Sequence, residues 1–153
     1  MIRKYTSADL ESVVTLFTQT VHIVSSRHYS PEEVEACAPL QPDMEAWEYY
    51  FNRRYTLVME SEDGIIGFGC LNRKGDVVEM LFTHHARQSE GTGSSILEAL
   101  EKEAVLHGIR ELTLTTSATA LTFYQKRGYN YHHNEKKAYG DMMFDCKILM
   151  KNI

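Results

Sequence analysis

The sequence predicts one mixed α/β domain over residues 1–153, with a central sheet of about seven strands flanked by helices. Three observations indicate this fold class. Apolar residues at helical spacing occupy the first third of the chain, strand-like segments separated by glycine turns follow from Tyr55, and a Gly-rich segment then joins a strand to a long amphipathic helix. A length of 153 residues suits a single domain with its own core.

The first helix is expected over residues 7–24, after a short N-terminal strand. Ser7 is a favoured N-cap residue, and the apolar residues behind it recur at helical spacing. These residues are Leu10, Val13, Val14, Phe17, Val21 and Val24.

Two shorter helices are expected next. Residues 30–33, Ser-Pro-Glu-Glu, combine an N-cap serine, a proline at the first helical position and a glutamate at the third, which is a capping box. A further helix is expected within residues 43–54, where Trp47 and Phe51 are four residues apart and share a face. Their role is predicted to be packing.

The pattern changes to strands from Tyr55 onward. Residues 55–61, 65–71 and 77–84 are β-rich segments, and Gly-containing turns separate them. Three antiparallel strands are therefore expected.

The long helix that follows carries an apolar stripe and ends at Gly108, a C′ glycine. Residues 111–116 form the next expected strand, parallel to strand 77–84 through a right-handed crossover. Ligands in such sheets bind at the carboxyl ends of the strands. A short helix over 118–128, stopped by Gly128, and two last strands complete the chain.

No metal centre is expected. Cys37, Cys70 and Cys146 are odd in number and lack the spacing of zinc or redox sites, so reduced thiols are predicted. His132 and His133 are neighbours on an expected strand, where they would point to opposite faces and could not share a metal.

Charge and hydropathy exclude other classes. The formal net charge is −5 and no cluster of Lys or Arg exceeds two residues, which argues against a nucleic-acid partner. The N-terminus lacks the apolar stretch of a signal peptide, and no apolar run reaches about 18 residues. A cytoplasmic protein without a membrane partner is expected.

Residues 86–95 have the pattern of an anion-binding loop, with the sequence Ala-Arg-Gln-Ser-Glu-Gly-Thr-Gly-Ser-Ser. A loop that opens a helix presents unpaired N–H groups at the positive end of the helix dipole, and Gly91 and Gly93 permit close approach of a phosphate. The loop lacks the Gly-Lys pair of nucleotide-triphosphate loops, and Ile96 replaces the third glycine of the dinucleotide fingerprint. Glu90 places an acid beside the expected phosphates.

Two segments carry a family resemblance. Gln88–Gly93 resembles the QxxGxG pyrophosphate loop of the GCN5-related N-acetyltransferases (GNAT family). Residues 117–129 resemble the late signature of the same family, with matches at Ala120, Phe123, Tyr124, Lys126, Gly128 and Tyr129. The expected order of elements is also that of the GNAT fold, so the resemblance covers nearly the whole chain.

Residues 27–39, a following Trp, and the segment Glu-Met-Leu-Phe at 79–82 resemble the YafP-like branch of bacterial acetyltransferases. The chain departs from the family pattern at three positions. His85 stands where a Pro is usual, Ser117 where an Asn is frequent, and Glu90 where a basic or small residue is commoner.

The resemblance implies acetyl-CoA as cosubstrate. Its pantetheine arm would pair with the backbone of Leu81, Phe82 and Thr83, on a strand splayed by a bulge. The remaining cofactor contacts implied by the family are Gln88, Ser89, Glu90, Gly91, Thr92, Gly93, Ser94, Ser117 and Phe123.

The resemblance also assigns roles in catalysis. The Tyr124 hydroxyl would stabilise the leaving thiolate, and Glu79 would accept the proton of the amine. His84 is a second candidate for this base and His28 a third. His28 and Tyr29 would line the acceptor pocket between the first helices.

Each of these residues has a structural alternative. Tyr124 can simply pack a helix against the sheet, Glu79 can be a solvated or salt-bridged strand residue, and Tyr29 can be the hydrophobic staple before Ser30. The expected function is transfer of an acetyl group to a primary amine of a small molecule or peptide. The alternative is a non-catalytic acyl-CoA-binding regulatory module, and the family is compatible with a homodimer.

Overall fold

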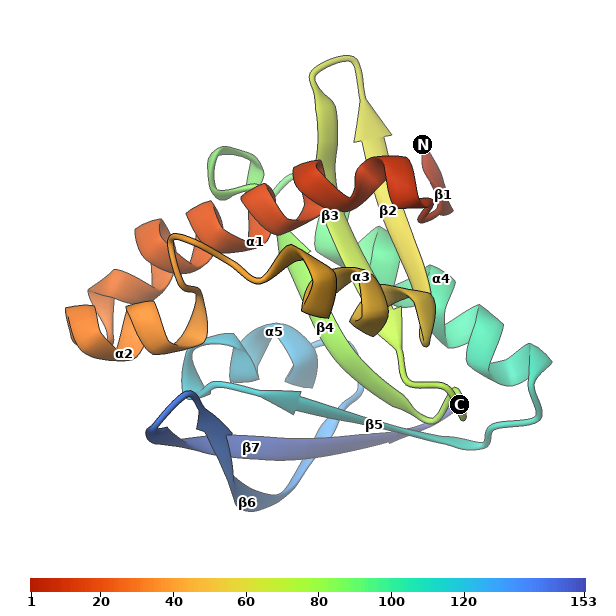
Figure 1. Cartoon of the computed structure of the whole chain (residues 1–153). Coiled ribbons are helices and arrows are strands. Elements are labelled where there is room, and N and C mark those ends of the chain that lie inside the picture. Colours follow the sequence, from red (N-terminus) through yellow and green to blue (C-terminus); the bar gives the residue numbers. More distant parts are fainter.

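A seven-stranded mixed sheet runs through the molecule in the order β1-β2-β3-β4-β5-β7-β6 (Figure 1). The structure is a computed structural model and describes all 153 residues. The strands are β1 (Ile2–Lys4), β2 (Tyr55–Ser61), β3 (Gly64–Leu71), β4 (Val77–Thr83), β5 (Glu111–Thr116), β6 (Asn130–Tyr139) and β7 (Met142–Asn152). Only β4 and β5 are parallel. The predicted mixed sheet and its parallel pair are confirmed.

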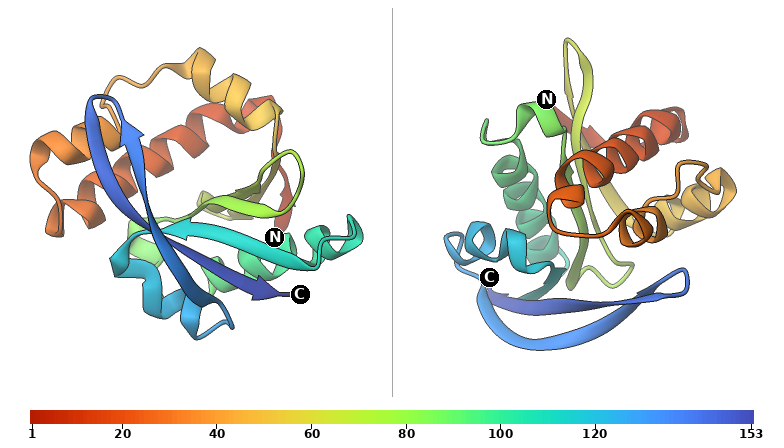
Figure 2. Two further views of the ribbon diagram at one scale, coloured as in Figure 1. Left: turned by 90° about the horizontal axis from the view of Figure 1, so that it is seen from below. Right: turned by 90° about the vertical axis from the view of Figure 1, so that its left-hand side faces the viewer.

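Helices cover both faces of this sheet, as the edge-on view in Figure 2 shows. One face carries α1 (Leu10–Val24), α2 (Pro31–Cys37) and α3 (Met44–Asn52), and the other carries α4 (Thr92–Leu106) and α5 (Leu121–Gln125). Each face has its own apolar core, so the sheet is buried on both sides.

The core on the α4 side depends on two glycines of β3. A Cβ on Gly67 would lie 2.8 Å from Thr92 Cγ2, and one on Gly69 would lie 3.0 Å from Ile96 Cγ2. These glycines therefore allow α4 to lie close against the sheet, with Ile96, Leu97 and Leu100 fully buried.

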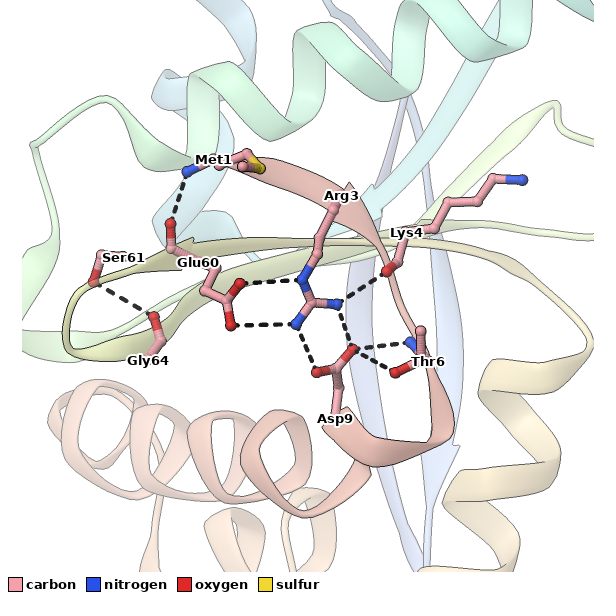
Figure 3. A network of polar contacts seen from close by, with 8 residues as sticks. All are labelled: Met1, Arg3, Lys4, Thr6, Asp9, Glu60, Ser61 and Gly64. Carbon is pink, nitrogen blue, oxygen red and sulfur yellow. Dashed lines mark hydrogen bonds and ion pairs between the residues drawn. The ribbon is translucent and has the colours of Figure 1, made fainter.

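The first helix starts differently from the prediction. Residues Ser7–Asp9 form a 3-10 turn before α1, and the N-cap is Thr6, so the prediction of Ser7 as N-cap is wrong by one residue. The cause is the Asp9 carboxylate, which accepts a hydrogen bond from the Thr6 N–H at 2.9 Å and two from Arg3 at 2.8 Å (Figure 3). These hydrogen bonds hold the turn so that it begins after Thr6 rather than after Ser7.

The capping box at α2 is confirmed. The Glu33 N–H donates to Ser30 Oγ at 3.1 Å, and the Ser30 N–H donates to Glu33 Oε1 at 2.9 Å. The packing role of Trp47 and Phe51 is also confirmed, since their rings stack with centroids 5.4 Å apart.

The last helix is shorter than expected. Within the predicted range 118–128, Ala118–Ala120 form a 3-10 turn and α5 covers only Leu121–Gln125. Gly128 follows with a φ of +94°, the left-handed conformation expected of a glycine after a helix.

His132 and His133 do not point to opposite faces. The register of β6 shifts between Tyr131 and His133, and the Nδ1 atoms of the two histidines lie 2.7 Å apart. The extra residue breaks the alternation on which the prediction depended. No group of three or more His, Cys, Asp or Glu side chains is arranged to hold a metal ion. None of the helices has the length and apolar character needed to cross a membrane.

Candidate active site

Strands β4 and β5 pair only through the first two residues of β4. Val77 pairs with Thr113 and Val78 with Leu114, whereas β4 continues to Thr83 and β5 to Thr116. The two strands therefore separate toward their carboxyl ends, and we call this gap in the sheet the β4–β5 opening. Ligands of parallel sheets bind at this end of the strands.

A β-bulge marks the point where the opening begins. Met80 pairs with Cys70 of β3 and Val78 pairs with Leu71, so Glu79 has no partner in β3. An extra residue of this kind bends its strand and increases the local twist. Glu79 also directly follows Val78, the last residue of β4 that pairs with β5.

The residues after the bulge present backbone groups to the opening. The His84 N–H donates to the Ile66 carbonyl of β3 at 2.8 Å. Because alternate residues of an antiparallel pair face the neighbouring strand, Phe82 faces β3, while Leu81 and Thr83 face the opening. The Thr83 carbonyl accepts a hydrogen bond from Thr20 of α1 at 3.2 Å.

The loop after β4 ends at an uncapped helix N-terminus. Gly91 is the N-cap of α4 with a φ of +85°, no side chain caps the helix, and its first turn contains no acidic residue. Ser89 also has a positive φ, +71°, which is uncommon for a residue with a Cβ. The first N–H groups of α4 are therefore free to bind an anion.

Gly93 brings three parts of the predicted cofactor site together. A Cβ at this position would lie 3.3 Å from Phe123 Cζ of α5 and 3.5 Å from Thr83 Cγ2 of β4. The first turn of α4 thus lies against both the end of β4 and the side chain of Phe123.

Arg127, which the sequence reasoning did not single out, fixes a positive charge at the same helix end. Its Nε donates to Ser94 Oγ and its Nη1 to the Phe123 carbonyl, both at 2.7 Å. Its guanidinium lies 3.7 Å from the centroid of the Phe123 ring. The i,i+4 spacing of Phe123 and Arg127 was the available signal.

A surface hollow of about 460 Å³ extends from this point. It is lined by Ser94, Leu97, Glu98, Glu101, Lys126, Arg127 and Lys151. Lys151 is paired with Glu101 at 2.9 Å, while Lys126 has no carboxylate partner. The hollow therefore has a cationic side next to the first turn of α4.

Glu90 and Ser117 lie at the margins of this site. Glu90 is exposed, and Arg87 Nη1 lies 3.5 Å from its Oε1 while the same guanidinium pairs with Asp63. Gln88 is also exposed in the loop. Ser117 follows β5, with its Oγ 2.7 Å from Thr119 Oγ1. The acid in the loop is thus accompanied by an arginine.

Tyr124 is almost fully buried, with 6% of its surface exposed. Its ring packs edge-on against Phe123 and Tyr129, at centroid distances of 5.0 and 6.0 Å. Its hydroxyl makes no hydrogen bond to another protein group, and burial raises the pKa of Tyr124. The packing of Tyr124 is therefore observed, and its role toward the leaving thiolate stays a prediction.

The Glu79 carboxylate accepts hydrogen bonds from Tyr50, in the last turn of α3, and from Arg54, which follows α3. Neither residue was singled out from the sequence. Arg54 Nε donates to Glu79 Oε2, and the Tyr50 hydroxyl donates to the same oxygen at 3.0 Å. The side chains of Glu79 and Arg54 are about three-quarters buried. Glu79 is therefore salt-bridged, as one sequence reading held, and its base role stays a prediction.

Tyr29 lies between α2 and the β6–β7 hairpin. Its ring contacts Phe144 of β7 edge-on at 5.6 Å, and it packs against the core that contains Val34. Burial raises the pKa of Tyr29. His28 is exposed, and His84 Nδ1 accepts a hydrogen bond from the Ala86 N–H at 3.1 Å.

Comparisons with known proteins agree with this architecture. The family model of the acetyltransferase (GNAT) domain matches residues 25–149. An uncharacterized N-acetyltransferase, YafP, of Escherichia coli strain K12 is 28% identical over 128 residues, which are 84% of this chain and 79% of that protein. This similarity supports the YafP-like branch.

Two solved structures share the fold over the full length of this chain. A GCN5-related N-acetyltransferase from Rhodopseudomonas palustris has a TM-score of 0.95 at 24% identity and is covered over 95% of its length. The PaiA N-acetyltransferase from Thermoplasma acidophilum, in complex with coenzyme A, has a TM-score of 0.83 at 21% identity and is covered over 98%. Together with the match of the family model to most of the chain, these findings show that the protein belongs to the acetyltransferase (GNAT) family and is an acetyl-CoA-dependent acyltransferase.

Proposed function

We propose that the protein transfers the acetyl group of acetyl-CoA to a primary amine of a small molecule or peptide, by direct attack in a ternary complex. The observation that carries this proposal is the β4–β5 opening, which ends at the uncapped N-terminus of α4. An extended thioester arm and a diphosphate fit these two adjacent features.

The parts of acetyl-CoA can be assigned to this surface. The diphosphate would bind the N–H groups at residues 88–94, and the pantetheine would pair with the backbone of Leu81 and Thr83. Arg127 and Lys126 would face the phosphorylated ribose from the hollow beside Ser94. The positive φ of Gly91 and the lack of a Cβ at Gly93 leave the first turn of α4 accessible.

The acceptor amine must lose a proton before it attacks. An amine with a pKa near 10.4 is free base in roughly one molecule in 2,500 at pH 7, so a nearby proton acceptor helps. Glu79, at the start of the opening, is the proposed acceptor of this proton. The neutral amine then attacks the thioester carbonyl.

Tyr124 is proposed to stabilise the leaving thiolate by a hydrogen bond. A phenol of ordinary pKa near 10 is already a weaker acid than a thiol near 8.5, and burial raises the pKa of Tyr124 further. A hydrogen bond from a neutral phenol is therefore favoured over full proton transfer. The thiolate takes up the second proton that the new amide nitrogen loses.

The acceptor is proposed to enter on the face of the sheet that carries α1 and α2. Tyr29 and its contact Phe144 lie where α2 meets the β6–β7 hairpin, and His28 is exposed beside them. The chemical identity of the amine is to be found by a screen of amino sugars, polyamines, aminoglycosides, amino acids and peptide N-termini.

Thermal unfolding with acetyl-CoA, CoA and ATP tests the cosubstrate. We expect both CoA species to raise the unfolding temperature and ATP to leave it unchanged. Release of free thiol in the presence of the amine panel then tests catalysis. Binding of acetyl-CoA without transfer to any amine would instead favour the non-catalytic regulatory module.

A further inference from the structure

The side chains of Arg54, Tyr50 and Glu79 form a single polar cluster beneath the bulge in β4. Arg54 follows α3, Tyr50 lies in its last turn, and Glu79 is the unpaired bulge residue. Nothing in the family resemblance assigns a role to Arg54 or Tyr50. We propose that these two residues are positioning residues that hold the Glu79 carboxylate for proton transfer, a role that rests on the proposed function.

The cluster constrains one oxygen of the carboxylate and leaves the other open. Arg54 Nε and the Tyr50 hydroxyl both donate to Oε2, the latter at 3.0 Å, whereas Oε1 accepts no hydrogen bond from the protein. Two donors, one of them charged, hold Oε2 in place and leave Oε1 without a protein donor. Oε1 is then the atom that accepts the proton of the ammonium group.

Arg54 is itself held rigidly. Its Nη1 donates to the Tyr50 carbonyl at 3.0 Å, and its guanidinium lies 3.5 Å from the centroid of the Tyr50 ring. The two residues are four apart in the sequence, so the last turn of α3 places the guanidinium flat on the ring. A lysine could supply the charge here but could not form the same planar contact and fork of hydrogen bonds.

Toward Glu79, the Tyr50 hydroxyl acts as a donor. Burial raises the pKa of the Tyr50 hydroxyl, which also lies 3.8 Å from the Cys70 sulfur. Cys70 is fully buried, and burial raises the pKa of its thiol to about 12. Both groups are therefore neutral near pH 7, and Glu79 is the one acceptor in the cluster that can take a proton from an amine.

The location of Glu79 connects this cluster to the reaction. The bulge places Glu79 directly after the last β4–β5 pair, where the opening begins. The proton passes from the ammonium nitrogen to Oε1, the neutral amine forms the new bond to the acetyl carbon, and the bond from that carbon to sulfur breaks. Glu79 afterwards releases its proton to solvent.

A double-mutant cycle on kcat tests the proposal. With an amine identified in the screen, we expect Arg54→Met to lower kcat about 10- to 100-fold and Tyr50→Phe about 3- to 10-fold, with the Kd of acetyl-CoA unchanged within two-fold. Arg54→Lys should restore part of the loss. In a Glu79→Gln background, Arg54→Met should change kcat less than two-fold, because a residue acting through Glu79 has nothing left to position.

The chain offers a matched control in the neighbouring pair. Arg53 lies 4.7 Å from the Tyr49 ring centroid with the same i,i+4 spacing, but it has no carboxylate partner. Arg53→Met and Tyr49→Phe should therefore leave kcat within two-fold of wild type. If Arg54→Met fails to fold, the kcat values of Arg54→Lys and Tyr50→Phe test the positioning role instead. Tyr50→Phe suits this purpose because it removes only a hydroxyl.

The possible failures are distinct. Arg54→Met with wild-type kcat, or with a loss that multiplies in the Glu79→Gln background, overturns the positioning role alone. Wild-type kcat in Glu79→Gln overturns both the base and its positioning residues, while the acetyltransferase function stands. Absence of acetyl transfer to every amine overturns the proposed function itself.

Discussion

The Tyr124 side chain is nearly buried, but its hydroxyl is not sealed from solvent. The ring is packed on Phe123 and Tyr129, but the hydroxyl has no partner within the protein. A structural tyrosine in a core usually satisfies its hydroxyl, as Tyr129 does with Glu101 at 2.7 Å. The Tyr124 hydroxyl is therefore free to donate to a ligand, as the proposed role requires.

Replacing Tyr124 with Phe tests that role. We expect kcat to fall about 10- to 100-fold, because the thiolate loses its hydrogen-bond donor, while the Kd of acetyl-CoA stays within two-fold of wild type. Steady-state kinetics and calorimetry measure the two quantities. Tyr5→Phe is the control, since the Tyr5 hydroxyl also has no hydrogen-bond partner but lies on the far edge of the sheet. Equal turnover in wild type and Tyr124→Phe would leave Tyr124 a packing residue.

Glu90 provides a second prediction about a single charge. At about 8 Å, two unit charges interact by roughly 0.5 kcal/mol in water and roughly 2 kcal/mol at an effective dielectric of 20. Glu90→Lys should therefore tighten CoA binding about two- to tenfold in low salt and less at high salt, as calorimetry at two ionic strengths will measure. Glu111→Lys, on the exposed start of β5, is the control. Weaker binding would mean that the contact between Arg87 and Glu90 shapes the loop.

Among the secondary-structure elements, α4 has the position on the sheet that matters most for the proposed site. The proposed cofactor loop requires that the first turn of α4 lie beside the end of β4, and the glycines of β3 permit that distance. Gly67 lies under Thr92 in the first turn, and Gly69 lies under Ile96 and Leu100 further along the helix. The two glycines therefore support different parts of the same helix.

Substituting each glycine by alanine separates these effects. We expect Gly67→Ala and Gly69→Ala each to destabilise the fold by about 1–3 kcal/mol, because the added methyl group overpacks a tight contact. Only Gly67→Ala should also weaken CoA binding, since it displaces the first turn. Denaturant titration and calorimetry on the folded variants give the two readouts. Equal weakening of binding by both would mean that the whole helix shifts.

At the scale of the whole molecule, one polar network attaches the N-terminal edge strand to the rest of the fold (Figure 3). Arg3 of β1 pairs with Asp9 before α1 and with Glu60 of β2, and the terminal amino group donates to the Glu60 carbonyl at 2.7 Å. Arg3 holds the pKa of the buried Asp9 below its usual value of 3.8. A carboxylate of this kind stabilises the folded state above the pKa of the unfolded chain.

Asp9→Asn measures this contribution and its pH dependence. At pH 7 we expect a loss of about 1–3 kcal/mol in the free energy of unfolding, because charge-assisted hydrogen bonds to Arg3 disappear. The stability conferred by Asp9 should decline as the pH falls below about 4, so the two proteins should converge there. Asp145→Asn, whose pair with Lys136 is exposed, should change stability by less than about 0.5 kcal/mol. A difference that persists unchanged at pH 2 would contradict the assignment.

Local patterns determined much of this fold. Ser30 and Glu33 predicted their helix start correctly because a capping box is formed within four residues, and Gly108 and Gly128 adopt the positive φ expected after helices. The sheet, its parallel pair and the anion loop follow from periodicity and glycine spacing. Ser7 and His132 were misjudged because the ion pair between Arg3 and Asp9 and a bulge in β6 altered the local geometry.

The site needed the tertiary structure. The family, the proposed anion loop at residues 88–94 and the proposed role of Tyr124 could be predicted from the sequence, since these are contiguous motifs whose chemistry is carried by neighbouring residues. Only the folded chain decided that Arg127 meets Ser94 and that Arg54 and Tyr50 meet Glu79, because these partners are separated by 25 to 33 residues. Such contacts depend on how α3, α4 and α5 pack against the sheet, and no local pattern contains that information.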